Sequence, residues 1–129
     1  HIDYQFVQQR EMQGVVVGGN IRCFLKLAGT EYMPELEGKI LLLESFSGTV
    51  AKMETYICQL QQMGAFDKIA GLLLGTFTEM EKEECIPTIE TLFKRAVGKD
   101  LPIVVTKDIG HGTDSKGILI GRELYMRER

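Results

Sequence analysis

The stretch Gly38-Lys39-Ile40-Leu41-Leu42-Leu43-Glu44 decides the fold. Its four central residues are all apolar and do not alternate with polar ones, so both faces of this strand are expected to be covered. Two more apolar runs of strand length follow, at Ile69 to Leu74 and at Ile103 to Val105. Buried strands that alternate with helices are typical of layered α/β domains. The sequence therefore predicts an α/β fold around three buried strands.

Helical periodicity separates these strands. Val50 to Met63 has apolar residues at helical spacing and is followed by Gly64, in the position of a left-handed C-cap. Pro87 fits the first turn of a second helix, which Gly98 is expected to stop. The acidic run Glu79 to Glu84 indicates a solvated loop and the start of a helix in preference to a metal cage.

The sequence patterns near both ends of the chain predict additional strands. Gln13 to Val17 reads as a strand that enters the turn Gly18-Gly19-Asn20, and a short helix ending at Gly29 follows. Lys116 to Ile120 and Glu123 to Met126 are expected to form a closing hairpin. These outer segments would add mixed or antiparallel pairs to the sheet.

The length and composition indicate how many domains the chain forms and which kinds of partner it is expected to bind. A chain of 129 residues with 44% hydrophobic content is expected to form a single domain, residues 1–129, with a core that needs no disulfide or metal. The net charge of -3 comes from 15 basic and 18 acidic residues that are interspersed. No basic stripe or polybasic patch results, so neither nucleic acid nor a membrane surface is an expected partner.

The cysteines and the lack of a long apolar run indicate the cellular compartment, and the first residue bears on whether the sequence is part of a longer protein. Cys23, Cys58 and Cys85 are odd in number and form no C-x-x-C pair, so we expect free thiols in a reducing compartment. No apolar run approaches the roughly 20 residues of a membrane span. The cytoplasm is therefore the expected location. Because the sequence starts at His1 without an initiator Met, we expect it to be cut from a longer protein.

Two ionisable residues stand at or shortly after the carboxyl ends of buried strands. Glu44 ends the strand that contains Ile40, and His111 lies between two glycines shortly after the strand at Ile103. Ligand sites in α/β sheets gather at such strand ends, so the two side chains suggest a carboxylate that orients an imidazole. Local sequence also allows Glu44 to point outward and His111 to be an exposed turn residue.

Such a pair needs a nucleophile, and the sequence offers no convincing one. The candidates are three serines and the three cysteines, and none stands in a G-x-S-x-G elbow. The serines are Ser45, Ser47 and Ser115. In strand geometry Ser45 would point to the side opposite Glu44. The turn Gly18-Gly19-Asn20 could offer backbone N–H groups to an anion, or could be a tight turn with Asn20 as the helix N-cap.

Several short motifs follow one another along nearly the whole chain. They are Gly18-Gly19-Asn20, Leu27-Ala28-Gly29-Thr30-Glu31-Tyr32-Met33-Pro34, Gly38 to Glu44, Gln59 to Gly64, Gly71 to Gly75, Leu101-Pro102-Ile103-Val104, Gly110-His111-Gly112 and Gly117. Their order and spacing are specific, and in these the chain resembles the C-terminal domain of the LD-carboxypeptidase family.

This resemblance implies a fold and a site. The fold is a three-layer, swivelling β/β/α domain with a mixed sheet. The family has a Ser-Glu-His triad, with its glutamate matched by Glu44 and its histidine by His111, while the serine stands on a separate N-terminal flavodoxin-like domain that is absent here. The family pattern around the glutamate is Leu-Glu-Asp, whereas this chain has Ser45 after Glu44. No metal or organic cofactor is implied.

The resemblance also implies a substrate and leaves alternatives open. The whole enzyme would cleave the amide before the terminal D-alanine of murein tetrapeptides in cell-wall recycling, as a homodimer, and this chain alone would be inactive. The alternatives are a microcin-immunity-type hydrolase of the same family that cleaves an aminoacyl-nucleotide conjugate, and a non-catalytic peptide-binding domain. Arg22, Lys107 and Lys116 are candidates for binding the substrate carboxylate.

Overall fold

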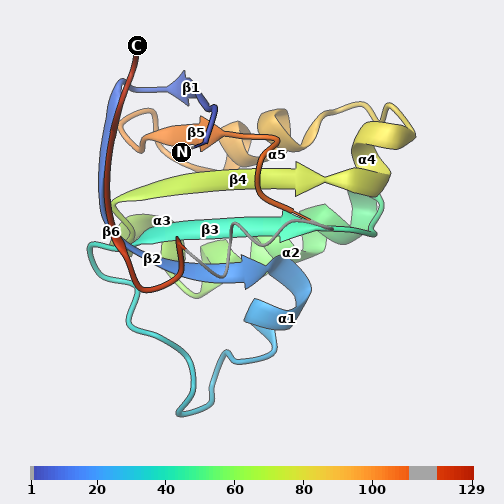
Figure 1. The fold of residues 1–129 in the computed structure, drawn as a ribbon. Coiled ribbons are helices and arrows are strands. Elements are labelled where there is room, and N and C mark those ends of the chain that lie inside the picture. The colour runs from blue at the N-terminus through green and yellow to red at the C-terminus, as the bar shows by residue number, and fades with distance from the viewer. Residues whose placement is uncertain (1, 111–118) are drawn as a thin grey trace.

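The computed structural model describes residues 2–110 and 119–129, which form one mixed sheet with helices (Figure 1). Within this part of the chain there are strands at both ends and helices between the central strands, as the apolar runs predict. The elements are β1 (Gln5–Gln8), β2 (Glu11–Asn20), α1 (Ile21–Leu25), β3 (Ile40–Ser45), α2 (Val50–Gln62), α3 (Ala65–Lys68), β4 (Gly71–Phe77), α4 (Thr78–Lys82), α5 (Ile89–Ala96), β5 (Ile103–Val105) and β6 (Glu123–Arg127).

The sheet has six strands in the order β1-β5-β4-β3-β2-β6. The four inner strands run parallel, while β1 and β6 pair antiparallel at the two edges. β2 is shared between two partners, because Glu11–Val15 pairs with β6 and Val16–Asn20 pairs with β3. Figure 1 shows β6 and the first part of β2 standing upright beside the starts of β3 and β4, while the rest of β2 runs along β3, so the sheet curls at this edge.

Each face of the inner sheet has its own core, as the unbroken apolar runs predict. On one face Leu41, Leu43 and Leu72 pack against α2 and α5. On the other face Leu42 and Leu73 pack against residues of β1, β2 and β6. These residues are Phe6, Met12, Val16 and Met126. The arrangement is a β/β/α stack of three layers, which confirms the predicted α/β fold class.

The helix boundaries follow local signals. Thr49 and Thr88 cap α2 and α5, and each side-chain oxygen accepts a backbone N–H three residues on. Gly64 has the left-handed φ of 76° predicted for a cap after α2. The acidic run starts in α4, a short helix at the end of β4. No described helix is long and apolar enough to cross a membrane.

The predicted closing hairpin is wrong in the residues that are described. Leu119 and Ile120 form no strand, and β6 pairs with β2 instead. The partner of β6 is about 110 residues away in sequence, and a pairing pattern read from neighbouring segments cannot detect such a contact. The short helix after β2 also ends at Leu25, four residues before Gly29.

Candidate functional site

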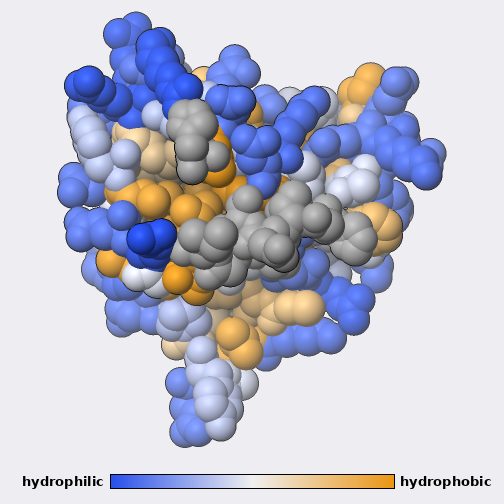
Figure 2. Space-filling model, viewed as in Figure 1, coloured by the Kyte–Doolittle hydropathy of each residue, from blue (hydrophilic) through white to orange (hydrophobic). Residues whose placement is uncertain are grey.

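The parallel strands bring several predicted residues to one edge of the sheet. β2 ends at Asn20 and β3 at Ser45, and Asn20 is the register partner of Glu44. β4 ends at Phe77 on the other side of β3. The candidate site therefore lies at the carboxyl ends of β2, β3 and β4, where parallel sheets place their ligands. Figure 2 shows hydrophobic residues exposed to the left of the centre of this molecular face and below it, with hydrophilic residues around the rim.

Glu44 is buried at this edge, with 2% of its surface exposed. It follows Leu43, whose side chain packs on the helix-facing core, so strand alternation puts Glu44 on the other face with Leu42. Burying a carboxylate without a partner would cost several kcal/mol. Glu44 does take part in an interaction, so its burial is compensated.

A bulge in β4 lies opposite Glu44. Leu43 pairs with Leu74 and Ser45 with Phe77, so two residues of β4 oppose the single Glu44. The two residues are Gly75 and Thr76. Bulges near strand ends bend the strand and redirect side chains, and they are common beside active sites.

Gly75 brings the Glu44 strand and the segment after β5 together. A methyl group on Gly75 would lie 3.2 Å from Cβ of Glu44 and 2.4 Å from the carbonyl O of Ile109. Thr76 donates its backbone N–H to that same carbonyl at 2.8 Å. Gly110 also packs closely on Thr76, since an added Cβ would stand 1.8 Å from Oγ1. The segment after β5 thus crosses the end of β4 and places Gly110 against Thr76, in the bulge opposite Glu44.

His111 lies outside the described residues, as do Ser115 and Lys116. The predicted pairing of Glu44 with His111 therefore stays a prediction. The described residues contribute one observation: Gly110, the residue before His111, is packed against Thr76 in the bulge opposite Glu44.

The other described nucleophile candidates include one buried serine and three free cysteines. Ser45 is buried and its hydroxyl donates to the carbonyl O of Ser47 at 2.6 Å, so this hydroxyl is already engaged. Cys23 and Cys58 are exposed free thiols, and Cys85 is a half-buried one. These observations single out no nucleophile among the described candidates.

Asn20 is the N-cap of α1. Its Oδ1 accepts the backbone N–H of Cys23 at 3.0 Å, which confirms the capping interpretation of the Gly-Gly-Asn turn. Gly18 is required for close strand contact, because a Cβ there would lie 2.1 Å from the carbonyl O of Leu42. Sequence reasoning did not detect that Asn20 stands beside Glu44, because the pairing of β2 with β3 has to be known first.

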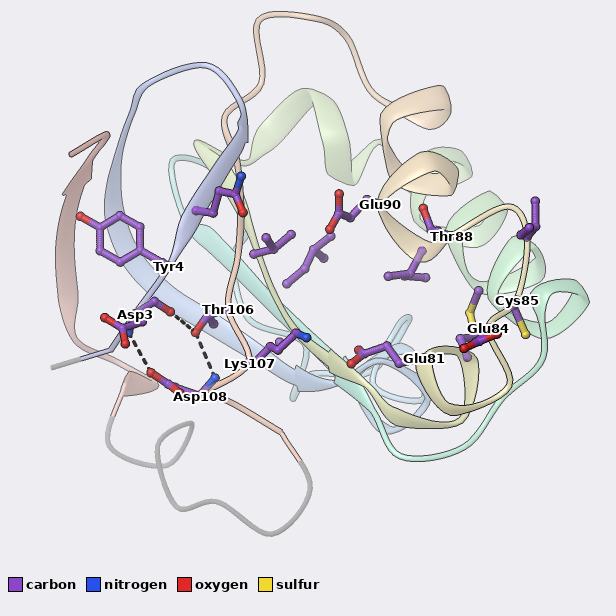
Figure 3. A pocket seen from close by; sticks show the side chains of 17 residues that line it. Asp3, Tyr4, Glu81, Glu84, Cys85, Thr88, Glu90, Thr106, Lys107 and Asp108 are labelled. Atoms are coloured by element: carbon purple, nitrogen blue, oxygen red, sulfur yellow. Dashed lines mark hydrogen bonds between the residues drawn. The ribbon is translucent and has the colours of Figure 1, made fainter.

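A cavity of the described structure lies between α4, α5 and the end of β5 (Figure 3). It measures about 910 Å³, and its apolar lining includes Leu74 and Ile89, which belong to the helix-facing core. Glu44 does not line it. Lys107 does, and Figure 3 shows its side chain directed toward Glu81. Gly75, which packs against Glu44, is also among the residues that line the cavity, so the cavity adjoins the predicted site through Gly75.

The fold and the strand-end carboxylate define a class: three-layer α/β domains with a buried acidic residue at the carboxyl edge of a mixed sheet. Comparison with known proteins specifies the family. The family model for the LD-carboxypeptidase C-terminal domain matches residues 13–126. The chain belongs to this family, as its motifs indicate.

Relatives and solved structures agree with this assignment. The microcin C7 self-immunity protein MccF of Escherichia coli is 30% identical over 111 residues, which are 82% of this chain and 31% of that protein. The murein tetrapeptide carboxypeptidase of Pseudomonas aeruginosa is 24% identical over 92% of this chain and 39% of its own length. The crystal structure of muramoyltetrapeptide carboxypeptidase from Oxalobacter formigenes has the same fold, with a TM-score of 0.74 and 21% identity over 100% of this chain and 46% of that one.

The matches cover most of this chain but a much smaller share of each curated relative. Nearly all of this chain is matched, yet it spans only about a third of the length of the curated relatives. What the whole proteins do therefore bears on this chain only through the part that it matches.

Proposed function

We propose that this chain is the C-terminal domain of a serine-type LD-carboxypeptidase that releases terminal D-alanine from murein tetrapeptides in the cytoplasm. The observation that carries the proposal is the burial of Glu44 at the carboxyl end of β3, within a domain that matches the family over residues 13–126. By the family resemblance, this position is that of the triad glutamate. A carboxylate that orients an imidazole is best placed in such a buried, strand-end position.

In the proposed mechanism the chain supplies two of three triad residues. A serine on an N-terminal flavodoxin-like domain attacks the carbonyl carbon of the amide before D-alanine. His111 takes the serine proton and returns it to the leaving amine, and water then hydrolyses the acyl-enzyme with His111 again as base. Glu44 holds the imidazole in the required tautomer and stabilises the imidazolium. The steps need no metal or organic cofactor.

The second candidate is an immunity-type hydrolase acting on an aminoacyl-nucleotide conjugate. It is supported by the 30% identity with MccF, against 24% with the murein tetrapeptide carboxypeptidase of Pseudomonas aeruginosa. Both candidates use the same two residues of this chain, Glu44 and His111, for amide hydrolysis. They differ in the groups that surround the reacting carbonyl, so substrate selection separates them.

The test uses the full-length protein and two substrates, a murein tetrapeptide and an aminoacyl-nucleotide conjugate. Release of D-alanine with much higher kcat/KM than cleavage of the conjugate supports the carboxypeptidase, and the reverse supports the immunity-type hydrolase. Binding of the tetrapeptide without turnover would instead identify a peptide-binding domain. The 129-residue chain is the matched control, and appreciable turnover by it alone would contradict a triad divided between two domains.

A further inference from the structure

Glu79, in the first turn of α4, holds the turn that follows β3. Its backbone N–H donates to the carbonyl O of Phe46 at 2.9 Å. Its side-chain Oε1 accepts the backbone N–H of Gly48 at 3.1 Å. One residue of α4 thus binds the turn on both sides of Ser47. The side-chain bond has an anionic acceptor, and such bonds are stronger than neutral ones.

This turn directly continues the strand that carries Glu44. Ser45 follows Glu44, and its hydroxyl donates to the carbonyl O of Ser47 within the turn. Since the turn and the strand end share one backbone, fixing the turn restricts how far Glu44 can move. A site of this kind needs its groups held to within about 0.5 Å.

Phe46 is the large side chain that the turn presents. It stands two residues after Glu44 and is 51% exposed. Single exposed apolar residues are common on protein surfaces, so exposure alone says little. What distinguishes Phe46 is the backbone beneath it, which Glu79 holds. A rigid aromatic side chain on a fixed backbone loses little conformational entropy when a ligand packs against it.

We propose that the Phe46–Gly48 turn is a wall of the substrate site. In this arrangement Phe46 contacts an aliphatic side chain of the peptide substrate next to the cleaved amide, and Glu79 is a positioning residue that fixes the turn. The inference rests on the proposed function and adds a specificity-determining contact and its support on α4.

The contact is tested by kinetics of the full-length protein on a murein tetrapeptide. Phe46→Ala should raise KM about tenfold, the effect expected from losing part of the burial of one aromatic ring, with kcat nearly unchanged. Phe46→Leu should restore most of the affinity. Tyr32→Ala is the matched control, because Tyr32 is an aromatic residue with 73% exposure in the loop after α1. Equal KM values for Phe46→Ala and the wild type would overturn the contact.

The positioning role is tested on the 129-residue chain itself. Glu79→Ala should speed amide hydrogen exchange at Gly48 at least tenfold, because this N–H loses its acceptor. Glu79→Gln keeps a side-chain oxygen and should retain most of the protection. In the full-length protein the two variants should differ in kcat. Glu79→Ala should have a lower kcat than the wild type, and Glu79→Gln should have a kcat near that of the wild type. Unchanged exchange at Gly48 in Glu79→Ala would overturn the role of Glu79.

The two kinds of failure can be told apart. A full-length protein that cleaves neither substrate contradicts the proposed function, whatever the Gly48 amide does. A protein that cleaves the tetrapeptide, but with the same KM and kcat in the Phe46 and Glu79 variants, contradicts only the inference about the turn.

Discussion

Gly75 lies against Glu44 at the carboxyl edge of the sheet, so closely that a methyl group on Gly75 would stand 3.2 Å from Cβ of Glu44. The same methyl group would be 2.4 Å from the carbonyl O of Ile109. The lack of a side chain at Gly75 therefore lets three segments meet, namely β3, the bulge of β4 and the segment that leads to His111.

Gly75→Ala should destabilise the domain by about 1–3 kcal/mol, since the added methyl group meets backbone that cannot move freely. Gly98→Ala is the matched control, because no atom lies within 4 Å of an added Cβ there. The control should leave the stability unchanged or raise it by up to about 1 kcal/mol. Urea unfolding of both variants checks this, and equal stabilities would show that the packing at Gly75 has room to relax.

Glu44→Gln and His111→Ala should each lower kcat/KM of the full-length protein about 10³–10⁴-fold while the fold is kept, as expected for triad members. The measurement is D-alanine release from a murein tetrapeptide, with circular dichroism to verify folding. Glu54→Gln removes an exposed carboxylate of α2 and serves as control. Near-native rates in the Glu44 or His111 variants would remove these residues from the proposed mechanism.

Asn20→Ala should destabilise the domain by about 1 kcal/mol, because the N–H of Cys23 loses its capping acceptor. Asn20→Asp keeps a side-chain oxygen and should retain most of the stability. Thermal or urea unfolding of the 129-residue chain measures both. If the two variants were equally destabilised, the cap would not be the reason for the loss.

The hydrogen bond from Tyr125 to Glu11 predicts a pH effect where β6 pairs with β2. The Tyr125 hydroxyl donates to Oε1 of Glu11 at 2.9 Å, and this bond raises the pKa of Tyr125 above the usual value for tyrosine. A raised pKa means that folding favours the neutral phenol. The resulting contribution to stability is present below the unfolded-state pKa of about 10 and is lost as pH rises through the folded-state pKa.

Glu11→Gln should therefore lower the pKa of Tyr125 toward its usual value. An NMR titration of the tyrosine ring resonances measures this, and Glu54→Gln removes the same charge from a distant helix as control. A Tyr125 titration that does not change in Glu11→Gln would show that Glu11 is not the cause of the shift.

The pattern of apolar residues by itself predicted a layered α/β fold and the position of Glu44 at a strand end, whereas the three β/β/α layers were implied only by the family resemblance. The run Ile40 to Leu43 has no polar residue, and only a strand covered on both faces buries all four side chains. The glutamate directly after this run was thereby assigned to a strand end. Local signals likewise located the helix from Val50 and its glycine cap at Gly64. These features depend on neighbours within a few residues.

Only the tertiary structure decided how separate segments meet at the site. Asn20 stands beside Glu44 through the register of β2 with β3, and the bulge at Gly75 arises from the register of β3 with β4. The bond between Glu79 and Gly48 joins residues 31 positions apart. Strand register and such long-range hydrogen bonds depend on the whole packed fold, whereas hydrophobic periodicity reports only which face of an element is buried.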